Sequence, residues 1–292
     1  MGMLPGGYWD ASGRLHREFE LATLTGREEE LLAQARQPQT ATLVTEVLSR
    51  CVSRLGDVAP VTPEVARQLL VADRQYLLLR LREATFGALV RANLRCPWPS
   101  CGEQVSIDFS VTDVPVEEAP HRAPAHTMTV SAEAAGDPDG IEVTFRLPNG
   151  SDQEDLSALV TANEAEALTR LLSRCVQRIG THSPPTPEQV AALSTLARSE
   201  IEERMHQLAP KVEQNMEATC SECGRGFAAP FDIHRFFLGE LRTDRDLLYQ
   251  EVHYLAYHYH WSEQEIMSMP RDRRRTYIDV LADAIEVMNS GS

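Results

Sequence analysis

The feature that most constrains the fold of this chain is an internal repeat with a fixed offset. Cys96 and Cys220 lie 220 − 96 = 124 residues apart, and many other matching residues share that offset. The register starts at Gly26, which matches Gly150, and a register held from there to the cysteines indicates a duplicated unit. The clearest matches place 49–52 on 173–176, Gly56 on Gly180, Pro60 on Pro184, and 62–64 on 186–188.

Two cysteine pairs lie at matching positions of the two copies. Cys96 and Cys101 enclose Pro-Trp-Pro-Ser, Cys220 and Cys223 enclose Ser-Glu, and a glycine follows each pair. Together they offer the four thiolates of a closed tetrahedral zinc site, so we expect each copy to bring half of it and one structural Zn²⁺ to join the copies. Cysteines without metal, another ion, and two half-sites completed by outside ligands are the alternatives. The wider spacing of the first pair departs from the Cys-x-x-Cys pattern.

The repeat predicts an α+β fold. It consists of two strand–helix–helix–zinc-knuckle units related by a pseudo-two-fold axis, with a helical C-terminal appendage. We divide the chain into a first repeat at 1–113, a proline-rich connector and hairpin at 114–140, a second repeat at 141–235 and a helical interaction segment at 236–292. With 292 residues, 42% of them hydrophobic, the chain can bury a core for this arrangement.

Each copy is expected to begin with a strand that leads into a helix. Polar and apolar residues alternate from Glu18 towards Leu24 and again over 141–147, which predicts half-buried strands. Thr25 and Asn149 then stand before acidic residues, as helix starts do. Residues 1–17 are glycine-rich and polar, and we expect them to form a surface lead-in.

The second helix of each copy has apolar residues spaced at three and four. This pattern predicts helices that end near Gly56 and Gly180, with these glycines as C-caps. Thr62 and Thr186, each followed by proline, predict the starts of the next helices. Strands are expected after the cysteine pairs, at 105–109 and 227–231, and a hairpin is expected to join 127–131 to Ile141.

The net negative charge of the chain limits the kinds of molecule that it can bind. The chain has 28 basic and 43 acidic residues and a net charge of −15, which argues against binding to nucleic acid or to an anionic membrane. It contains no run of 18 apolar residues, and its N-terminus lacks the basic start and apolar core of a signal peptide. We therefore predict a cytoplasmic protein, in which cysteines bind metal more often than they form disulfides.

The tail from Arg235 onward has no counterpart in the first copy. It predicts a helix over 238–257, a capping box at 261–265 and a final helix over 271–287. His253, His258 and His260 alternate with tyrosines before Trp261. A second metal site is conceivable there, but helical spacing leaves His258 off the face that His253 and His260 share. We favour an aromatic packing or interface surface.

Two further groups receive a structural interpretation. Arg271 to Arg275 is the one basic run; a phosphate or nucleic-acid contact is an alternative, and we predict a solvated face or a protein contact. Cys51 and Cys175 lie on the apolar faces of equivalent helices. A metal or redox pair is an alternative, and we predict that they are two small buried hydrophobic residues. The residues predicted to bind a partner are His253, Tyr257, His260, Trp261, Arg271 and Arg274.

The closing motifs resemble a known family. From Phe236 the chain reads as a hydrophobic helix, then His260-Trp-Ser, an acidic pair, Met269-Pro and an arginine-rich helix. This ending resembles the T-even-type phage baseplate protein family, also found with contractile injection systems. The opening Leu4-Pro-Gly-Gly-Tyr and Leu24-Thr-Gly-Arg-Glu-Glu-Glu are similar to longer, zinc-knuckle-bearing relatives. The resemblance covers 236–292 best.

The resemblance implies a baseplate or hub component, or an assembly factor, whose partners are other proteins of a contractile tail. It brings no catalytic residues, and the sequence shows no phosphate-binding loop, nucleophile elbow or His-Glu-x-x-His motif. We therefore predict a protein that is not an enzyme and that belongs to a phage-like particle. A metal- or thiol-dependent enzyme and a nucleic-acid-binding zinc ribbon are the rival functions.

Overall fold

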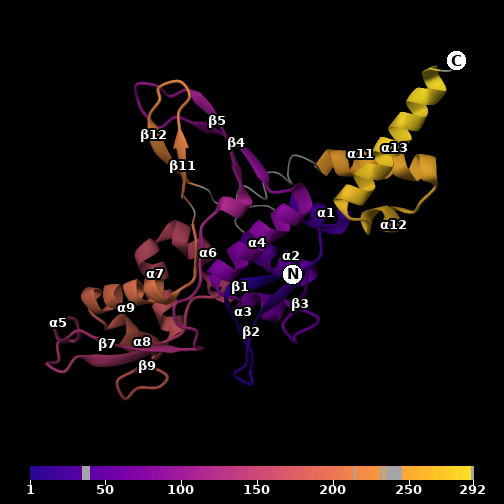
Figure 1. Ribbon diagram of the computed structural model, residues 1–292. Coiled ribbons are helices and arrows are strands. Elements are labelled where there is room, and N and C mark those ends of the chain that lie inside the picture. Colours follow the sequence, from indigo (N-terminus) through magenta and orange to yellow (C-terminus); the bar gives the residue numbers. More distant parts are fainter. Residues whose placement is uncertain (35–39, 214, 231–232, 234–244, 291–292) are drawn as a thin grey trace.

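The structure is a computed structural model that describes residues 1–34, 40–213, 215–230, 233 and 245–290. It is a mixed α+β fold with small antiparallel sheets and a helical C-terminal region (Figure 1). Two three-stranded sheets, each with its own helices, lie in the lower half of the view. Two hairpins extend from them at the upper left, and the tail helices project to the right.

The first unit has strand order β1-β2-β3. Its sheet carries four helices and a core that includes Leu4, Phe19, Leu48 and Leu77, all buried. The strands are β1 (Gly2–Trp9), β2 (Leu15–Leu21) and β3 (Val52–Leu55), and the helices are α1 (Gly26–Gln34), α2 (Thr40–Cys51), α3 (Pro63–Gln68) and α4 (Val71–Phe86).

The second unit has strand order β7-β8-β9 and a separate core. β7 pairs with β8, as the expected hairpin requires, so a strand from the segment 114–140 completes this sheet. The strands are β7 (His126–Val130), β8 (Ile141–Phe145) and β9 (Val176–Ile179), and the helices are α5 (Ala132–Ala135), α6 (Gly150–Ala162), α7 (Glu164–Cys175), α8 (Pro187–Ala191) and α9 (Thr195–Leu208).

The two sheets have the same register at equivalent positions. Phe19 pairs with Leu55 in the first sheet, and Val143 pairs with Ile179 in the second. In each sheet the pairing register shifts once along the middle strand, just before Leu21 in β2 and just before Phe145 in β8. Each member of these pairs is 124 residues from its equivalent, so the sequence offset is reproduced as a common strand topology.

Two hairpins extend from the units and meet at their tips. β4 (Leu89–Arg95) pairs with β5 (Gln104–Ser110), which leads into a short 3-10 helix, η1 (Val111–Asp113). β11 (Asn215–Thr219) pairs with β12 (Gly226–Pro230). A two-residue pairing of β6 (Val116–Glu117) with β10 (Lys211–Val212) joins the chain between the units to the end of the second. The cysteines lie in the two hairpin turns.

The tail consists of α11 (Arg245–Tyr259), α12 (Glu263–Met267) and α13 (Arg271–Ser290). Ser262 and Glu265 form the expected capping box at the start of α12. α11 and α12 lie against α1 of the first unit, and α13 runs outward to the C-terminus (Figure 1). The predicted helix over 238–257 is observed from Arg245, and 238–244 lie outside the described residues.

Two secondary-structure predictions are wrong. Residues 2–9 of the expected surface lead-in form β1, because β1 pairs with β2 and buries Leu4 in the core. The predicted second helices end at Cys51 and Cys175, and the next four residues form β3 and β9, whose ladder hydrogen bonds replace the last helical turn. Gly56 and Gly180 therefore end strands, with φ of 56° and 52°, and do not cap helices.

Candidate metal centre

The four predicted cysteines come together between the hairpin tips. Their sulfur atoms all lie within 4.8 Å of one another. The Sγ atoms of Cys96 and Cys223 are 3.9 Å apart, and those of Cys101 and Cys220 are 3.8 Å apart. All four are free thiols. Zinc–sulfur bonds of about 2.3 Å in a tetrahedron place neighbouring sulfurs about 3.8 Å apart, so this spacing fits a metal ion and excludes disulfides.

Local backbone geometry turns the sulfurs inward. The N–H of Cys96 donates to Glu103 O at 2.9 Å, and the N–H of Cys220 donates to Arg225 O at 3.0 Å, so each turn closes in the same way. Gly102 and Gly224 follow the second cysteine of each pair with φ of 69° and 70°, a conformation that glycine adopts without strain. Two turns of different length therefore close with the same backbone hydrogen bond and the same glycine conformation.

The electrostatics of the cluster favour a cation. The N–H of Cys223 lowers the pKa of Cys220 to about 7, which favours its thiolate. The N–H of Glu103 lowers the pKa of Cys101, but burial and the three neighbouring sulfurs outweigh it and raise that pKa to about 12. Four thiolates at this spacing repel one another unless a positive ion lies between them. A divalent metal supplies that charge, and the donor set of four sulfurs suits it.

A second contact clasps the two hairpin tips beside the sulfurs. The Trp98 indole N–H donates to Gly226 O at 3.3 Å, and Arg225 donates to the Ser100 hydroxyl at 3.3 Å. The guanidinium of Arg225 lies 5.4 Å from the centre of the Trp98 ring, which is cation–π distance. The residues that widen the first cysteine pair thus bind the second hairpin. Sequence spacing alone did not indicate this clasp.

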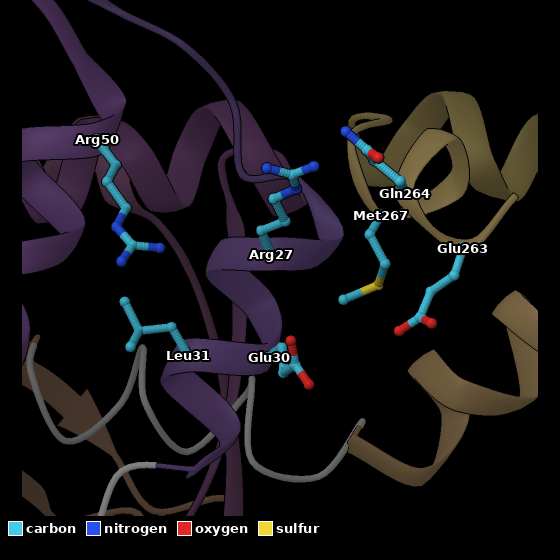
Figure 2. Close-up of a pocket in the computed structure, with 7 residues that line it drawn as sticks. All are labelled: Arg27, Glu30, Leu31, Arg50, Glu263, Gln264 and Met267. Carbon is cyan, nitrogen blue, oxygen red and sulfur yellow. The ribbon is translucent and has the colours of Figure 1, made fainter.

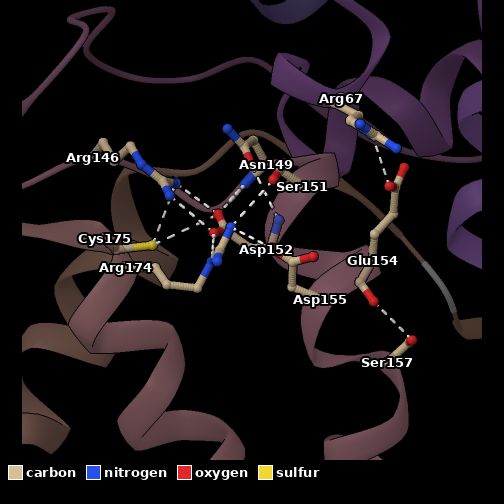
Figure 3. Close-up of polar contacts among 10 residues, drawn as sticks. All are labelled: Arg67, Arg146, Asn149, Ser151, Asp152, Glu154, Asp155, Ser157, Arg174 and Cys175. Carbon is tan, nitrogen blue, oxygen red and sulfur yellow. Dashed lines mark hydrogen bonds and ion pairs between the residues drawn. The ribbon is translucent and has the colours of Figure 1, made fainter. Parts of the chain in front are cut away.

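The two units also meet at the N-terminus of α6. Arg74, fully buried in α4, donates to Thr45 Oγ1 at 2.9 Å and to Ala41 O at 2.8 Å. Thr45 donates in turn to Glu154 of α6. Glu154 also accepts from Arg67 at 2.9 Å (Figure 3). Burial lowers the pKa of Arg74 to about 10, against the effect of Glu154. The guanidinium remains charged at neutral pH and ties the first unit to the second.

The start of α6 is held by a cluster of its own. Asp152 is 1% exposed and accepts from Arg146 at 2.6 and 2.9 Å and from Arg174 at 2.7 Å (Figure 3). Burial alone would raise the pKa of Asp152, but the two arginines outweigh it and lower the pKa. Cys175 lies beside this cluster, fully buried, and burial raises its pKa to about 12. Cys51 is buried in the same way, as expected for structural residues.

The tail is attached to the first unit by a buried ion cluster. Glu29 of α1 accepts from Arg271 at 2.8 Å and from Arg274 at 2.9 and 3.1 Å, and all three side chains are at most 5% exposed. Arg274 also donates to Glu251 of α11 at 2.6 Å. Burial opposes the charge on Arg274, but Glu29 and Glu251 raise its pKa. The prediction of a solvated face is therefore wrong for Arg271 and Arg274, because Glu29 draws them into the fold.

A pocket of about 480 Å³ opens at this junction. Arg27, Glu30 and Leu31 of α1 line one side and Met267 of α12 lies opposite (Figure 2). The remaining lining residues are Arg50, Glu263 and Gln264. Charged side chains of both signs line the pocket together with the apolar Leu31 and Met267.

The aromatic residues of the tail divide into a packed group and an exposed group. Trp261 stacks on Tyr259 with ring centres 4.6 Å apart and meets Tyr277 edge-on at 4.8 Å. His253 and His260 are exposed, and Tyr257 is 69% exposed. Within the described residues the four cysteines are the one cluster suited to a metal, so the histidines do not form a second. Partner binding by the tail residues stays a prediction.

The four cysteines join two hairpins, and the buried arginine clusters join separate parts of the fold. These sites therefore serve the structure of the protein. The chain belongs to the T4 bacteriophage base plate protein family, whose model matches residues 12–238. Residues 241–292 match a second model, a family of unknown function (DUF6760). The resemblance to the base plate family is therefore confirmed. The sequence placed it mainly in residues 236–292, whereas the family model matches the two sheet-bearing units.

No curated protein and no solved structure matches this chain. None of the described helices is long and apolar enough to cross a membrane.

Proposed function

We propose that this protein is a structural component or assembly factor of the baseplate or hub of a contractile phage tail or injection system, and that it is not an enzyme. The match of the base plate family model over residues 12–238 carries the proposal. Its partners are other baseplate proteins, and it is made in the cytoplasm before it joins a phage-like particle. A site closed by four thiolates leaves no open coordination position, so its metal supports folding and not catalysis.

The metal is one structural Zn²⁺ that clips two copies of a duplicated unit. The matching sheet registers support the duplication. The sulfur distances support a pseudo-two-fold axis through the metal: exchanging Cys96 with Cys220 and Cys101 with Cys223 converts the 3.9 Å pair into the 3.8 Å pair. In this arrangement the repeats at 1–113 and 141–235 are the bodies, and 236–292 is the interaction segment.

The outer face of α11 is the surface that meets a neighbour. Tyr257 is 69% exposed, with His253 and His258 around it, and an exposed aromatic ring flanked by polar groups is typical of an interface. The exposed His260 continues this surface to the start of α12, and the half-buried Trp261 borders it, stacked on Tyr259. In contrast, Arg271 and Arg274 hold the tail in place behind it.

The experiment is particle assembly with Tyr257→Asp in the cells that make the particle. We expect particles to be lost or to lack this chain, seen by electron microscopy and immunoblotting, while the purified chain stays folded and keeps its zinc. Val160→Asp is the matched control, because Val160 is a 56% exposed apolar residue on α6, far from the tail. Normal particles that contain the Tyr257→Asp chain would show that this surface is not the interface.

A further inference from the structure

α12 and α13 repeat the geometry of the helix pairs α3–α4 and α8–α9. Each pair starts at a capping Ser or Thr, at Thr62, Thr186 and Ser262, and has a short first helix. The second helix of each pair begins nine residues after the capping residue. An arginine stands twelve residues after the capping residue in every pair, at Arg74, Arg198 and Arg274. The prediction that the tail has no counterpart in the first copy is therefore wrong for this part.

Two of the three pairs bind the same kind of segment. The junction where a strand turns into an α-helix, residues 148–154, lies on α3–α4, and the equivalent junction, residues 24–30, lies on α12–α13. Leu70 bridges Asn149, and Pro270 bridges Thr25, at equivalent positions of both partners. The N–H of Val71 donates to Pro148 O at 3.4 Å, and the N–H of Arg271 donates to Leu24 O at 3.3 Å.

Each bound junction presents a glycine and an acidic residue to the arginine of the helix pair. A Cβ atom on Gly150 would collide with the guanidinium of Arg74, and one on Gly26 would lie 2.8 Å from Met267 Sδ and 3.3 Å from Arg274 Nη1. The arginine of α12–α13 binds Glu29 directly, and the arginine of α3–α4 reaches Glu154 through Thr45. Both bound helices start with glycine and carry the carboxylate at the fourth or fifth helical position, Glu29 in α1 and Glu154 in α6.

The third pair, α8–α9, has an equivalent surface, but no strand-to-helix junction of the described residues lies on it. Among the described residues, none pairs with Ser194 or Thr195 as Asn149 pairs with Leu70, and both are exposed. Arg198 donates to Thr169 at 3.1 Å, as Arg74 donates to Thr45 at 2.9 Å, so the two arginines are held in the same way. The Nε atoms of both are buried without a hydrogen-bond partner among the described residues. Figure 1 shows α8 and α9 at the end of the molecule opposite the tail.

The short helix α5 lies beside this surface and does not replace the junction. Ser194 donates to Ala134 O at 2.7 Å, and Ser131 donates to Glu200. In the first unit the turn at Gly6 occupies the corresponding position, and the N–H of Gly6 donates to Asp73. The pair α3–α4 nevertheless binds residues 148–154. Both contacts therefore fit on one helix pair.

We propose that the outer surface of α8–α9, formed by Leu193, Ser194, Thr195 and Arg198, binds a strand-to-helix junction of another protein. The occupant has a glycine at the first helical position and Glu or Asp at the fourth or fifth, as α1 and α6 have. A second copy of this chain is not the occupant, because its own two junctions are both covered. That the other protein is a baseplate neighbour rests on the proposed function; the binding chemistry does not.

The test uses the full chain and a peptide of residues 147–162, lactam-bridged to hold its helix and labelled for fluorescence anisotropy. We expect saturable binding below about 1 mM that Arg198→Ala weakens by about tenfold or more, since hydrogen bonds to charged groups are among the stronger ones. Thr195→Pro should also weaken binding, because it removes the N–H that would donate to the peptide while proline is well tolerated at the first position of a helix. Arg204→Ala, on the same helix outside the surface, should leave binding unchanged.

A peptide with Gly150→Leu is the control for the ligand and should not bind. If circular dichroism shows both peptides helical and they bind equally, or neither binds up to about 1 mM, the proposal is wrong. Arg198-dependent self-association of the full chain in sedimentation would instead identify a second copy as the occupant and refute the choice of partner. None of these outcomes depends on particle assembly, so this test is separate from that of Tyr257.

Discussion

Replacing Glu29 with glutamine removes the carboxylate that accepts hydrogen bonds from both Arg271 and Arg274 at the tail junction. Glu29 is 4% exposed and the two arginines are 5% and 0% exposed, so water does not compensate for the lost charge. Removing one partner of a buried ion pair costs about 3–5 kcal/mol. Glutamine keeps one oxygen that can accept from an arginine, so we take the lower end, about 3 kcal/mol.

This cost falls on the attachment of the tail more than on the fold of the two units. α12 and α13 have few contacts with the body apart from α1, whereas each unit has its own core. About 3 kcal/mol raises the population of a detached tail by roughly a hundredfold. The Glu29→Gln chain should therefore keep its global unfolding midpoint nearly unchanged while α12 opens.

Native-state hydrogen exchange measures this directly. We expect protection of the α12 amides to fall by roughly a hundredfold, while those of β8 and β9 are unaffected. Glu263→Gln is the matched control, because Glu263 is an exposed glutamate of α12 at the same junction. Unchanged α12 exchange in Glu29→Gln, or an equal loss in both variants, would refute the reasoning that this buried cluster holds the tail.

Three further predictions concern the cores and the metal. Elemental mass spectrometry should find about one zinc per chain, and Cys223→Ser should lose it and unfold the hairpins, because structural zinc supplies folding free energy; two metals or none in the wild type would contradict the shared site. Gly150→Ala should cost about 1–3 kcal/mol in urea unfolding, because its Cβ collides with Arg74, whereas Gly226→Ala, whose Cβ would meet its nearest atom only at 3.9 Å, should be near neutral. Burial outweighs the N–H groups that bind Asp73 and raises its pKa to about 6. Because that pKa is above the unfolded value, the stability of the wild type relative to Asp73→Asn should be greatest below about pH 4 and should fall by about 3 kcal/mol as the pH rises through 6; a flat difference between the two chemical denaturation curves would contradict it.

Local patterns predicted the elements whose chemistry is local. The caps at Thr62, Asn149, Thr186 and Ser262 are all observed, because a capping side chain bonds to N–H groups within its own first turn. The cysteine pairs were found because a metal knuckle needs two thiols on one tight turn.

The errors lie where tertiary contacts overrode the pattern. Val52 and Leu55 continue the helical spacing of α2, yet they pair with β2, since apolar residues three apart also suit a short strand buried at both ends. Gly6 and Gly7 made the N-terminus look like a surface segment, but their N–H groups bind the buried Asp73. The partner that decided each case is distant in the sequence.

The sequence by itself determined the offset of 124 residues, the four thiols and the acidic character of this protein, since these depend only on which residues occur and at what spacing. Only the tertiary structure decided that Arg271 and Arg274 are buried, because their charge is tolerated inside the fold only beside Glu29, more than two hundred residues earlier. It also decided that α12–α13 is a third helix pair. Its resemblance to the other two lies in a capping Ser or Thr, the positions of the helices and one arginine, and these are too few side chains for the repeat to show along the chain.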